Sequence, residues 1–327
     1  MITRLTGMDV ANASMYDGST ATAEAMFMAS AITKRQAILV SETLHPSNLE
    51  VLKTYAHYKG LNIIPLPATH GVITLETLKA HVNDQTAALI VQTPNIYGLI
   101  EDYDGFADVL HDHKALFVIN QDPATLSHLK PAGAYDADIA VGEAQSLGVP
   151  LSFGGPYIGY MATKDKYVRK MPGRICGMTT DVDGKPAFTL TLQAREQHIR
   201  RDKANSNICS NQSLLALFVT IYLSVMGKAG LREAAQQSLD GAHYLYEELL
   251  KTGLFEDPFN QPFFKEFTLK TTEPIENLKE KAREKGFLAP FDLSILGLEE
   301  GLVSFAVTEK RTQAELDALV SALGGGR

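Results

Sequence analysis

Short apolar runs alternate with longer amphipathic stretches through the first half of the 327-residue chain. The runs are almost wholly apolar, which is typical of strands buried on both faces of a sheet. The predicted order is helix 21–31, strand 37–40, helix 46–58, strand 61–66, helix 75–82, strand 87–91, helix 103–113 and strand 116–119. Pro46 stands at a helix start, where proline is tolerated. Repeated units of this kind predict an α/β fold with a mostly parallel sheet and right-handed crossovers.

The pattern changes after about residue 160. It predicts a charged helix over 191–203, an apolar helix over 214–225 and an amphipathic helix over 231–252. The apolar helix is about a dozen residues long, which favours a buried core helix over a membrane span. Strands over 264–269 and 302–307, with helices over 276–285 and 313–323, predict a smaller α+β unit. We therefore expect a large domain over residues 1–230 and a small C-terminal domain over 231–327.

Composition favours a soluble globular protein and argues against binding of nucleic acid or of an anionic membrane. Hydrophobic residues make up 45% of the chain and charged residues 21%, as in ordinary soluble globular proteins. The net charge of −8 argues against nucleic acid or an anionic membrane as partner, because both require clustered Lys and Arg. The N-terminus lacks the pattern of a signal peptide, and two cysteines, Cys176 and Cys209, make no disulfide framework. A cytoplasmic location is predicted, with both thiols buried or without a role.

One stretch places polar side chains at the end of a buried strand. The apolar run 139–142 leads into Gln145 and Ser146, and a glycine-rich turn then precedes a strand over 157–161. Asp122 likewise follows the strand 116–119. Ligands of α/β proteins bind at the carboxyl ends of parallel strands, so this edge is the candidate site. The alternative for Asp122 is a simple turn opener before proline.

The turn 14–20 precedes the first predicted helix and contains Ser14 and Gly18. Backbone N–H groups in such a turn can hold a phosphate, although an ordinary helix cap explains the same residues. His111 and His113 are spaced poorly for a metal, so a solvated surface is expected there and no metal site is predicted.

Five stretches, in order along nearly the whole chain, carry a resemblance to a known family. They are Asn12–Gly18, Thr93–Gly98, Gln145–Pro150, Leu192–Arg201 and Ser206–Gln212. The chain resembles the P-protein (glycine decarboxylase) of the glycine cleavage system, and more narrowly its subunit 1, the alpha subunit without the cofactor lysine. It is shorter than a typical subunit 1 by about the first quarter. The resemblance implies the fold of pyridoxal-phosphate (PLP) dependent transferases of fold type I.

In that fold Ser146 stands where the Schiff-base lysine is expected. The nearest lysines, Lys130, Lys164 and Lys166, are not at the strand end, so we expect no catalytic residue and no covalent PLP on this chain. The resemblance makes Ser14 and Gly18 vestigial phosphate-site residues, and Asp122 a vestigial partner of the pyridinium nitrogen. It implies further candidates for a subunit interface or an active-site lining: Asn95, Gln145, Arg195, His198, Asn207 and Asn211. A purely internal role is the alternative for the region around Arg195.

The resemblance implies a non-catalytic subunit of glycine dehydrogenase (aminomethyl-transferring). With subunit 2, which would carry PLP, it would decarboxylate glycine and pass the aminomethyl group to the lipoyl arm of H-protein. The expected assembly is a heterotetramer. One rival hypothesis is a stand-alone binding or scaffold protein that kept the fold. Another is an independent PLP enzyme, against which Ser146 argues.

Overall fold

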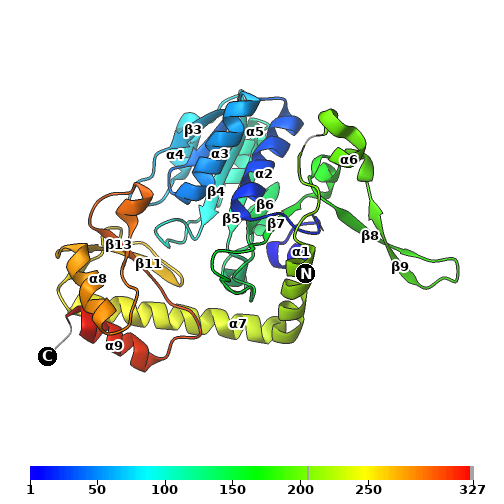
Figure 1. Ribbon diagram of the computed structural model, residues 1–327. Helices are drawn as coiled ribbons and strands as arrows, with labels where there is room; N and C mark the ends of the chain where they lie inside the picture. Colours follow the sequence, from blue (N-terminus) through cyan, green and yellow to red (C-terminus); the bar gives the residue numbers. More distant parts are fainter. Residues whose placement is uncertain (205, 325–327) are drawn as a thin grey trace. The chain divides into compact units, whose positions relative to one another are not determined.

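The computed structural model describes residues 1–204 and 206–324 (Figure 1). Backbone contacts divide the chain into two compact units. Unit 1 comprises Met1–Pro67, Ile73–Gln92 and Asp102–Gly227, and unit 2 comprises Ala68–Val72, Thr93–Glu101 and the chain from Lys228 onward. The division after Gly227 is close to the predicted boundary at residue 230. The two short segments of unit 2 join it through contacts distant in sequence, such as the bridge between Leu99 and Phe263.

Unit 1 is built on a seven-stranded sheet with the order β1-β7-β6-β5-β4-β2-β3. The strands are β1 Val10–Ala11, β2 Ala37–Ser41, β3 Asn62–Leu66, β4 Thr86–Thr93, β5 Leu116–Gln121, β6 Ile139–Glu143 and β7 Gly159–Thr163. The pairs β2–β3, β2–β4 and β5–β6 are parallel, while β7 is antiparallel to β6 and β1. Every residue of β5 is buried, so both faces of the sheet are covered. The predicted mostly parallel sheet is confirmed.

Five helices of unit 1 connect or cover these strands. They are α1 Ile2–Thr6, α2 Gly18–Thr33, α3 Pro46–Lys59, α4 Leu75–His81 and α5 Phe106–Asp112. Helix α3 begins at Pro46 and ends at Gly60 in the left-handed conformation, as the pattern predicts. Helix α2 packs on α3 and on strands β5, β6 and β7, as Figure 1 shows. Its first turn therefore lies beside the end of β6.

The predicted charged helix over 191–203 is wrong. This stretch forms two short 3-10 turns, η4 Gln193–Arg195 and η5 Arg201–Lys203, around the four-residue helix α6 Gln197–Arg200. A left-handed backbone at Arg201 (φ 54°) breaks the helix. Just before it, β8 Ile175–Thr180 and β9 Pro186–Thr191 form an antiparallel hairpin that the sequence analysis missed.

Helix α7 runs from Ser213 to Lys251 and is interrupted at Gly227, whose φ of 58° is not helical. The predicted buried helix over 214–225 is wrong for this chain, because five large apolar side chains are exposed there: Leu214, Leu217, Phe218, Ile221 and Val225. We call these five residues the apolar stripe. Their spacing of three and four residues places them on one side of the helix. Hydrophobic periodicity cannot distinguish a helix that faces its own core from one that faces another molecule.

Among the described residues, α7 alone is long and apolar enough to cross a membrane by length and composition. This criterion is weak, since core helices of soluble proteins also meet it. The break at Gly227 and the charges of Lys228 and Arg232 divide the helix into two halves.

Unit 2 has a four-stranded sheet with the order β10-β11-β13-β12. Its strands are β10 Phe255–Glu256, β11 Glu266–Thr271, β12 Phe291–Asp292 and β13 Leu302–Ala306, and its helices after α7 are α8 Ile275–Glu284 and α9 Gln313–Leu323. Phe267, Leu269 and Val303 lie at the centre of its own apolar core. The predicted α+β unit is confirmed.

Candidate functional site

The carboxyl edge of the unit 1 sheet brings Ser146 and Asp122 together. The Oγ of Ser146, in the loop after β6, donates a hydrogen bond of 2.5 Å to Oδ1 of Asp122, which follows β5. The same Oδ1 accepts from the backbone N–H of Ala124 at 3.0 Å, so Asp122 also caps the turn that begins at Pro123. Two side chains that the sequence placed at this edge are therefore bonded directly to each other.

The turn 14–18 lies at the same edge and is occupied by protein groups. Ser14 is buried, and its Oγ accepts hydrogen bonds from Nδ2 of Asn211 at 2.7 Å and from the backbone N–H of Gln212 at 2.9 Å. Asp17 is the N-cap of α2, and its carboxylate accepts from the backbone N–H of Thr20 at 2.7 Å. The structure thus joins the predicted candidates Ser14 and Asn211 in one contact.

Glu143, the last residue of β6, is the residue of this edge that the sequence analysis did not single out. Its Oε2 accepts from the backbone N–H of Gly18 at 2.9 Å, and its Oε1 accepts from those of Gln145 and Ile158 at 3.1 Å each. Burial raises the pKa of Glu143, the three N–H bonds lower it, and the charge of Asp17 raises it; the net direction is upward. The sequence signal was an acid ending an apolar strand.

These residues do not fit PLP. Serine cannot form an imine with an aldehyde, and Ser146 is bonded to the aspartate that would pair with the pyridinium nitrogen. The N–H of Gly18, at the start of α2, already donates to Glu143, and the Ser14 hydroxyl already accepts two donors. A phosphate in this turn would meet the carboxylates of Asp17 and Glu143 instead of positive charge.

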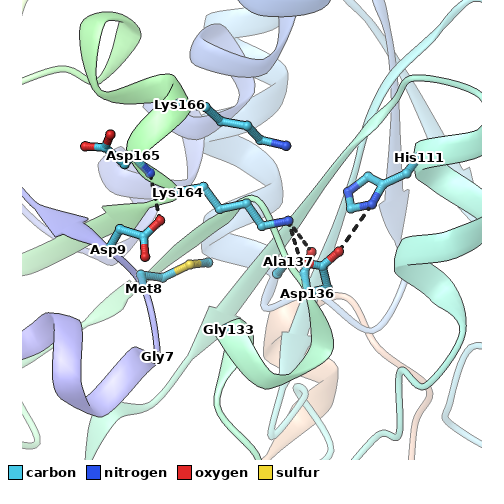
Figure 2. A pocket seen from close by; sticks show the side chains of 10 residues that line it. All are labelled: Gly7, Met8, Asp9, His111, Gly133, Asp136, Ala137, Lys164, Asp165 and Lys166. Atoms are coloured by element: carbon cyan, nitrogen blue, oxygen red, sulfur yellow. Dashed lines mark hydrogen bonds and ion pairs between the residues drawn. The ribbon is translucent and has the colours of Figure 1, made fainter.

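Lys164 and Lys166 lie at the opposite, amino edge of the sheet. They follow β7, whose end pairs with the start of β6, and they line a cavity of about 540 Å³ (Figure 2). The Nζ of Lys164 is 2.7 Å from Oδ1 of Asp136 and 3.3 Å from Oδ1 of Asp138. Lys130, by contrast, pairs with Asp104 and lies over the ring of Tyr135. The two cavity lysines are thus held by carboxylates on the side of the sheet away from Ser146.

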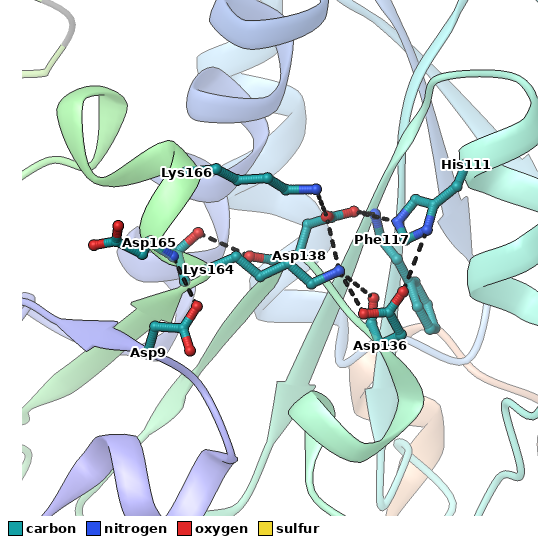
Figure 3. Close-up of polar contacts among 9 residues, drawn as sticks. Asp9, His111, Phe117, Asp136, Asp138, Lys164, Asp165 and Lys166 are labelled. Carbon is teal, nitrogen blue, oxygen red and sulfur yellow. Dashed lines mark hydrogen bonds and ion pairs between the residues drawn. The ribbon is translucent and has the colours of Figure 1, made fainter.

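Asp138 is the centre of this amino-edge network and is fully buried (Figure 3). Its Oδ2 is 2.8 Å from Nε2 of His111 and accepts from the backbone N–H of Phe117 at 3.0 Å. Lys164 and Lys166 approach its Oδ1 at 3.3 and 3.7 Å. Burial alone would raise the pKa of Asp138, but the bonds with His111 and Phe117 and the nearby positive charges together lower it.

The predicted solvated surface at His111 is wrong. Its ring lies between two carboxylates, with Nδ1 3.5 Å from Asp136 and Nε2 2.8 Å from Asp138, and its side chain is 30% exposed. No local sequence pattern indicates this contact, because Asp138 lies 27 residues further along the chain. Within residues 1–204 and 206–324, no group of three or more His, Cys, Asp or Glu side chains could hold a metal ion. Both cysteines are free and exposed.

Asn95, another of the candidate residues, serves the interior of its own unit. Asn95 is 2% exposed, and its Nδ2 donates to the carbonyl of Gly71 and to Glu101, at 2.8 Å each. Its Oδ1 accepts from the backbone N–H groups of Tyr97 and Leu99, so the side chain holds the 95–99 turn together.

Arg195 donates to the backbone carbonyls of Met171, Gly173 and Leu192. It therefore fastens the segment after β9 to the loop before β8. His198 is exposed, with Nδ1 3.7 Å from the buried carboxylate of Glu196, and Asn207 is exposed as well. These two side chains are open to contact with another molecule, whereas Arg195 is committed within the chain.

Comparison with known proteins gives matches to one family along nearly the whole chain. Residues 1–323 match the family model described as the glycine cleavage system P-protein. A relative from Geobacillus kaustophilus, called probable glycine dehydrogenase (decarboxylating) subunit 1, is 47% identical over 327 residues, which are 100% of this chain and 73% of that protein. A relative of the same name from Chlorobium chlorochromatii is 50% identical over 99% of this chain and 72% of its own length.

Solved structures give the same assignment. A crystal structure of glycine decarboxylase (P-protein) of the glycine cleavage system, in inhibitor-bound form, superposes with a TM-score of 0.93 at 43% identity, covering 99% of this chain and 73% of that one. A NifS-like protein superposes with a TM-score of 0.69 at 13% identity over 98% of this chain and 84% of that one, which shows the shared fold alone. The chain, with its mixed α/β fold of the PLP-transferase type, therefore belongs to the glycine cleavage system P-protein family and to its subunit 1 branch.

Proposed function

We propose that this chain works as the cofactor-free subunit of a cytoplasmic glycine dehydrogenase (decarboxylating). Its partner, subunit 2, carries PLP and the Schiff-base lysine, and the two form a heterotetramer. The assembly decarboxylates glycine and delivers the aminomethyl group to the lipoyl arm of H-protein. This chain contributes no chemical step of its own. It completes the fold of the assembly.

The apolar stripe is the observation that carries this proposal. Leu214 and Val225 are 78% and 79% exposed. Exposure of large aliphatic side chains to water is unfavourable in free energy. A monomer of ordinary composition buries such a stripe in its own core, whereas a subunit buries it against its partner. Phe153, in the loop between Ser146 and β7, is likewise fully exposed. We assign the stripe, with the open side chains His198 and Asn207, to the contact with subunit 2.

The test is assembly with subunit 2, measured by size exclusion and by glycine–CO2 exchange. The wild-type chain should co-elute with subunit 2 and switch on the exchange activity. The double variant Leu217→Glu with Ile221→Glu places two charges in the stripe and should weaken association at least about tenfold. Exchange activity should fall in parallel, and excess variant chain should restore part of it.

A matched control is Ile295→Glu, because Ile295 of unit 2 is 65% exposed and lies outside the apolar stripe. The control chain should assemble as the wild type does. Assembly of the stripe variant with unchanged affinity would contradict the interface. A wild-type chain that stays monomeric and indifferent to subunit 2 would favour the rival hypothesis of a stand-alone binding protein.

A further inference from the structure

Three backbone N–H groups from separate segments converge on one carboxylate at the carboxyl edge of the sheet. Gly18 opens helix α2, Gln145 follows β6, and Ile158 precedes β7, and all three donate to Glu143. An ionised carboxylate only accepts hydrogen bonds, so it matches a cup made wholly of donors. We call the N–H groups of Gly18, Gln145 and Ile158 the N–H cup. The cup suits an anion, and in this chain the carboxylate of Glu143 is that anion.

The start of helix α2 is shaped around Glu143. A Cβ on Gly18 would lie 2.7 Å from the backbone nitrogen of Glu143 and 2.9 Å from its Cβ, so glycine alone permits this approach. The N-terminus of a 16-residue helix also carries partial positive charge, which attracts the carboxylate. Asp17 adds a second carboxylate at the same helix end, as its N-cap. A further anion would have to displace Glu143 and approach Asp17.

We infer that this edge is closed to a phosphate-bearing cofactor at two independent points, and that the missing lysine is only one of them. The first point is position 146, where serine stands in place of the lysine and bonds to Asp122, and the second is Glu143 in the N–H cup. Installing a lysine at position 146 therefore leaves the second barrier in place. Glu143 is a self-supplied anion that keeps the cup from taking the phosphate of any aldehyde cofactor.

The experiment compares cofactor capture by the 327-residue chain and its variants. Each protein is mixed with PLP, the imine band is recorded, and borohydride reduction followed by peptide mass mapping locates the modified lysine. S146K alone should show no more site-specific adduct at position 146 than at surface lysines. E143A combined with S146K should show at least about tenfold more adduct at that position, because the lysine is present and the three N–H groups are vacated, although Asp17 remains at the helix end.

A control carboxylate distinguishes the barrier from a general loosening of the fold. Asp292 accepts from the backbone N–H of Ser294 in unit 2, so D292A combined with S146K removes a carboxylate that caps a backbone N–H far along the sequence. This double variant should behave like S146K alone. E143Q with S146K keeps the side-chain volume and serves if the alanine variant does not fold; its adduct should exceed that of S146K.

Formate supplies a readout without PLP. E143A should lose thermal stability, and formate, entering the vacated cup, should raise its melting temperature more than it raises that of the wild type. Efficient adduct formation by S146K alone, or equal adduct in S146K and both Glu143 double variants, would overturn the inference. The inference rests on the proposed cofactor-free role, but its measurements use the isolated chain. Failure here is therefore distinguishable from failure to bind subunit 2.

Discussion

The two edges of the unit 1 sheet hold carboxylates by different means. At the carboxyl edge, Glu143 is surrounded by backbone N–H groups, which bring dipoles but no net charge. At the amino edge, Asp138 faces His111, Lys164 and Lys166 in addition to one N–H group. The pKa shifts follow the difference: that of Glu143 is raised and that of Asp138 is lowered. Burial raises the pKa at both sites. At Asp138 the hydrogen bonds with His111 and Phe117, together with the nearby positive charges, outweigh burial; at Glu143 the three N–H bonds do not, and the charge of Asp17 adds to the rise.

The amino edge of the sheet is structural, whereas the carboxyl edge is the usual place for a ligand. The amino-edge network ties together α5, β5, β6 and the segment after β7, so it holds the sheet whatever the chain binds. The carboxyl edge is where α/β proteins bind ligands, and here it is filled by Glu143 and by the pair Ser146–Asp122. In this chain the fold is retained while its own side chains occupy the carboxyl edge of the sheet.

The largest effect is expected from Asp138→Asn. Asp138→Asn removes the buried charge at the centre of the network and leaves His111 and Lys164 only their contacts with the exposed Asp136, so the free energy of unfolding should fall by about 3–5 kcal/mol. Urea unfolding followed by circular dichroism and tyrosine fluorescence measures it, since the chain has no tryptophan. Asp136→Asn is the matched control; Asp136 is 67% exposed and should matter by less than about 1 kcal/mol.

The pH dependence of the same pair of proteins sharpens the comparison. The pKa of Asp138 is lower in the folded chain than in the unfolded chain. Its contribution is therefore present above the unfolded pKa and is lost as the pH falls through the folded pKa. The stability gap between wild type and Asp138→Asn should close in acid. A gap that stays constant to low pH would mean that the charge of Asp138 is irrelevant.

Glu24, on α2, is a buried carboxylate whose pKa is set mainly by burial, and its replacement should have an effect of intermediate size. It is 3% exposed, and burial raises its pKa to about 7, against smaller opposing contributions from Ser206 and Lys59. A raised folded pKa gives stability that is present below the unfolded pKa and is lost as the pH rises through about 7. Glu24→Gln should therefore match the wild type below the unfolded pKa near 4.5, gain on it as the pH rises from there to about 7, and exceed it in mild alkali by about 2–3 kcal/mol.

Thermal unfolding across that pH range measures the Glu24 effect. Glu76→Gln is the control, because Glu76 is an exposed residue at the start of α4 and should leave the pH profile unchanged. If Glu24→Gln and the wild type follow parallel profiles, the carboxyl group is ionised in the fold, and burial alone does not keep it neutral.

Elements with strong local patterns were predictable, and contacts between distant segments were not. The runs that became β4 and β5 are apolar throughout, and Pro46 and Gly60 mark the ends of α3 directly. Strand ends also placed Ser146 and Asp122 at one edge, because parallel strands share a direction. The partners of Glu143 and Asp138 come from residues as far apart as 125 positions, and no local pattern carries that information.

Exposure was the second limit of prediction. The apolar stripe has the composition of a core helix, and only its surroundings show that this chain leaves it uncovered. The stretch after β9 has helix-forming residues, but the Arg195 side chain bonds to three backbone carbonyls and the turn at Arg201 ends the helix. In both cases tertiary context overrode a correct local preference.

The smallest effect is expected from Ser146→Ala, which tests whether the carboxyl edge has any structural task left. The hydroxyl of Ser146 is exposed and bonds to Asp122, which keeps its bond from the N–H of Ala124 in the variant. Water can replace the lost donor, so the free energy of unfolding should change by less than about 1 kcal/mol. Association with subunit 2 and exchange activity should be unchanged within error. A loss of several kcal/mol would mean that the Ser146–Asp122 bond stabilises the carboxyl edge in the way that the Asp138 network stabilises the amino edge. The contrast between an inert edge and a structural edge would then be mistaken.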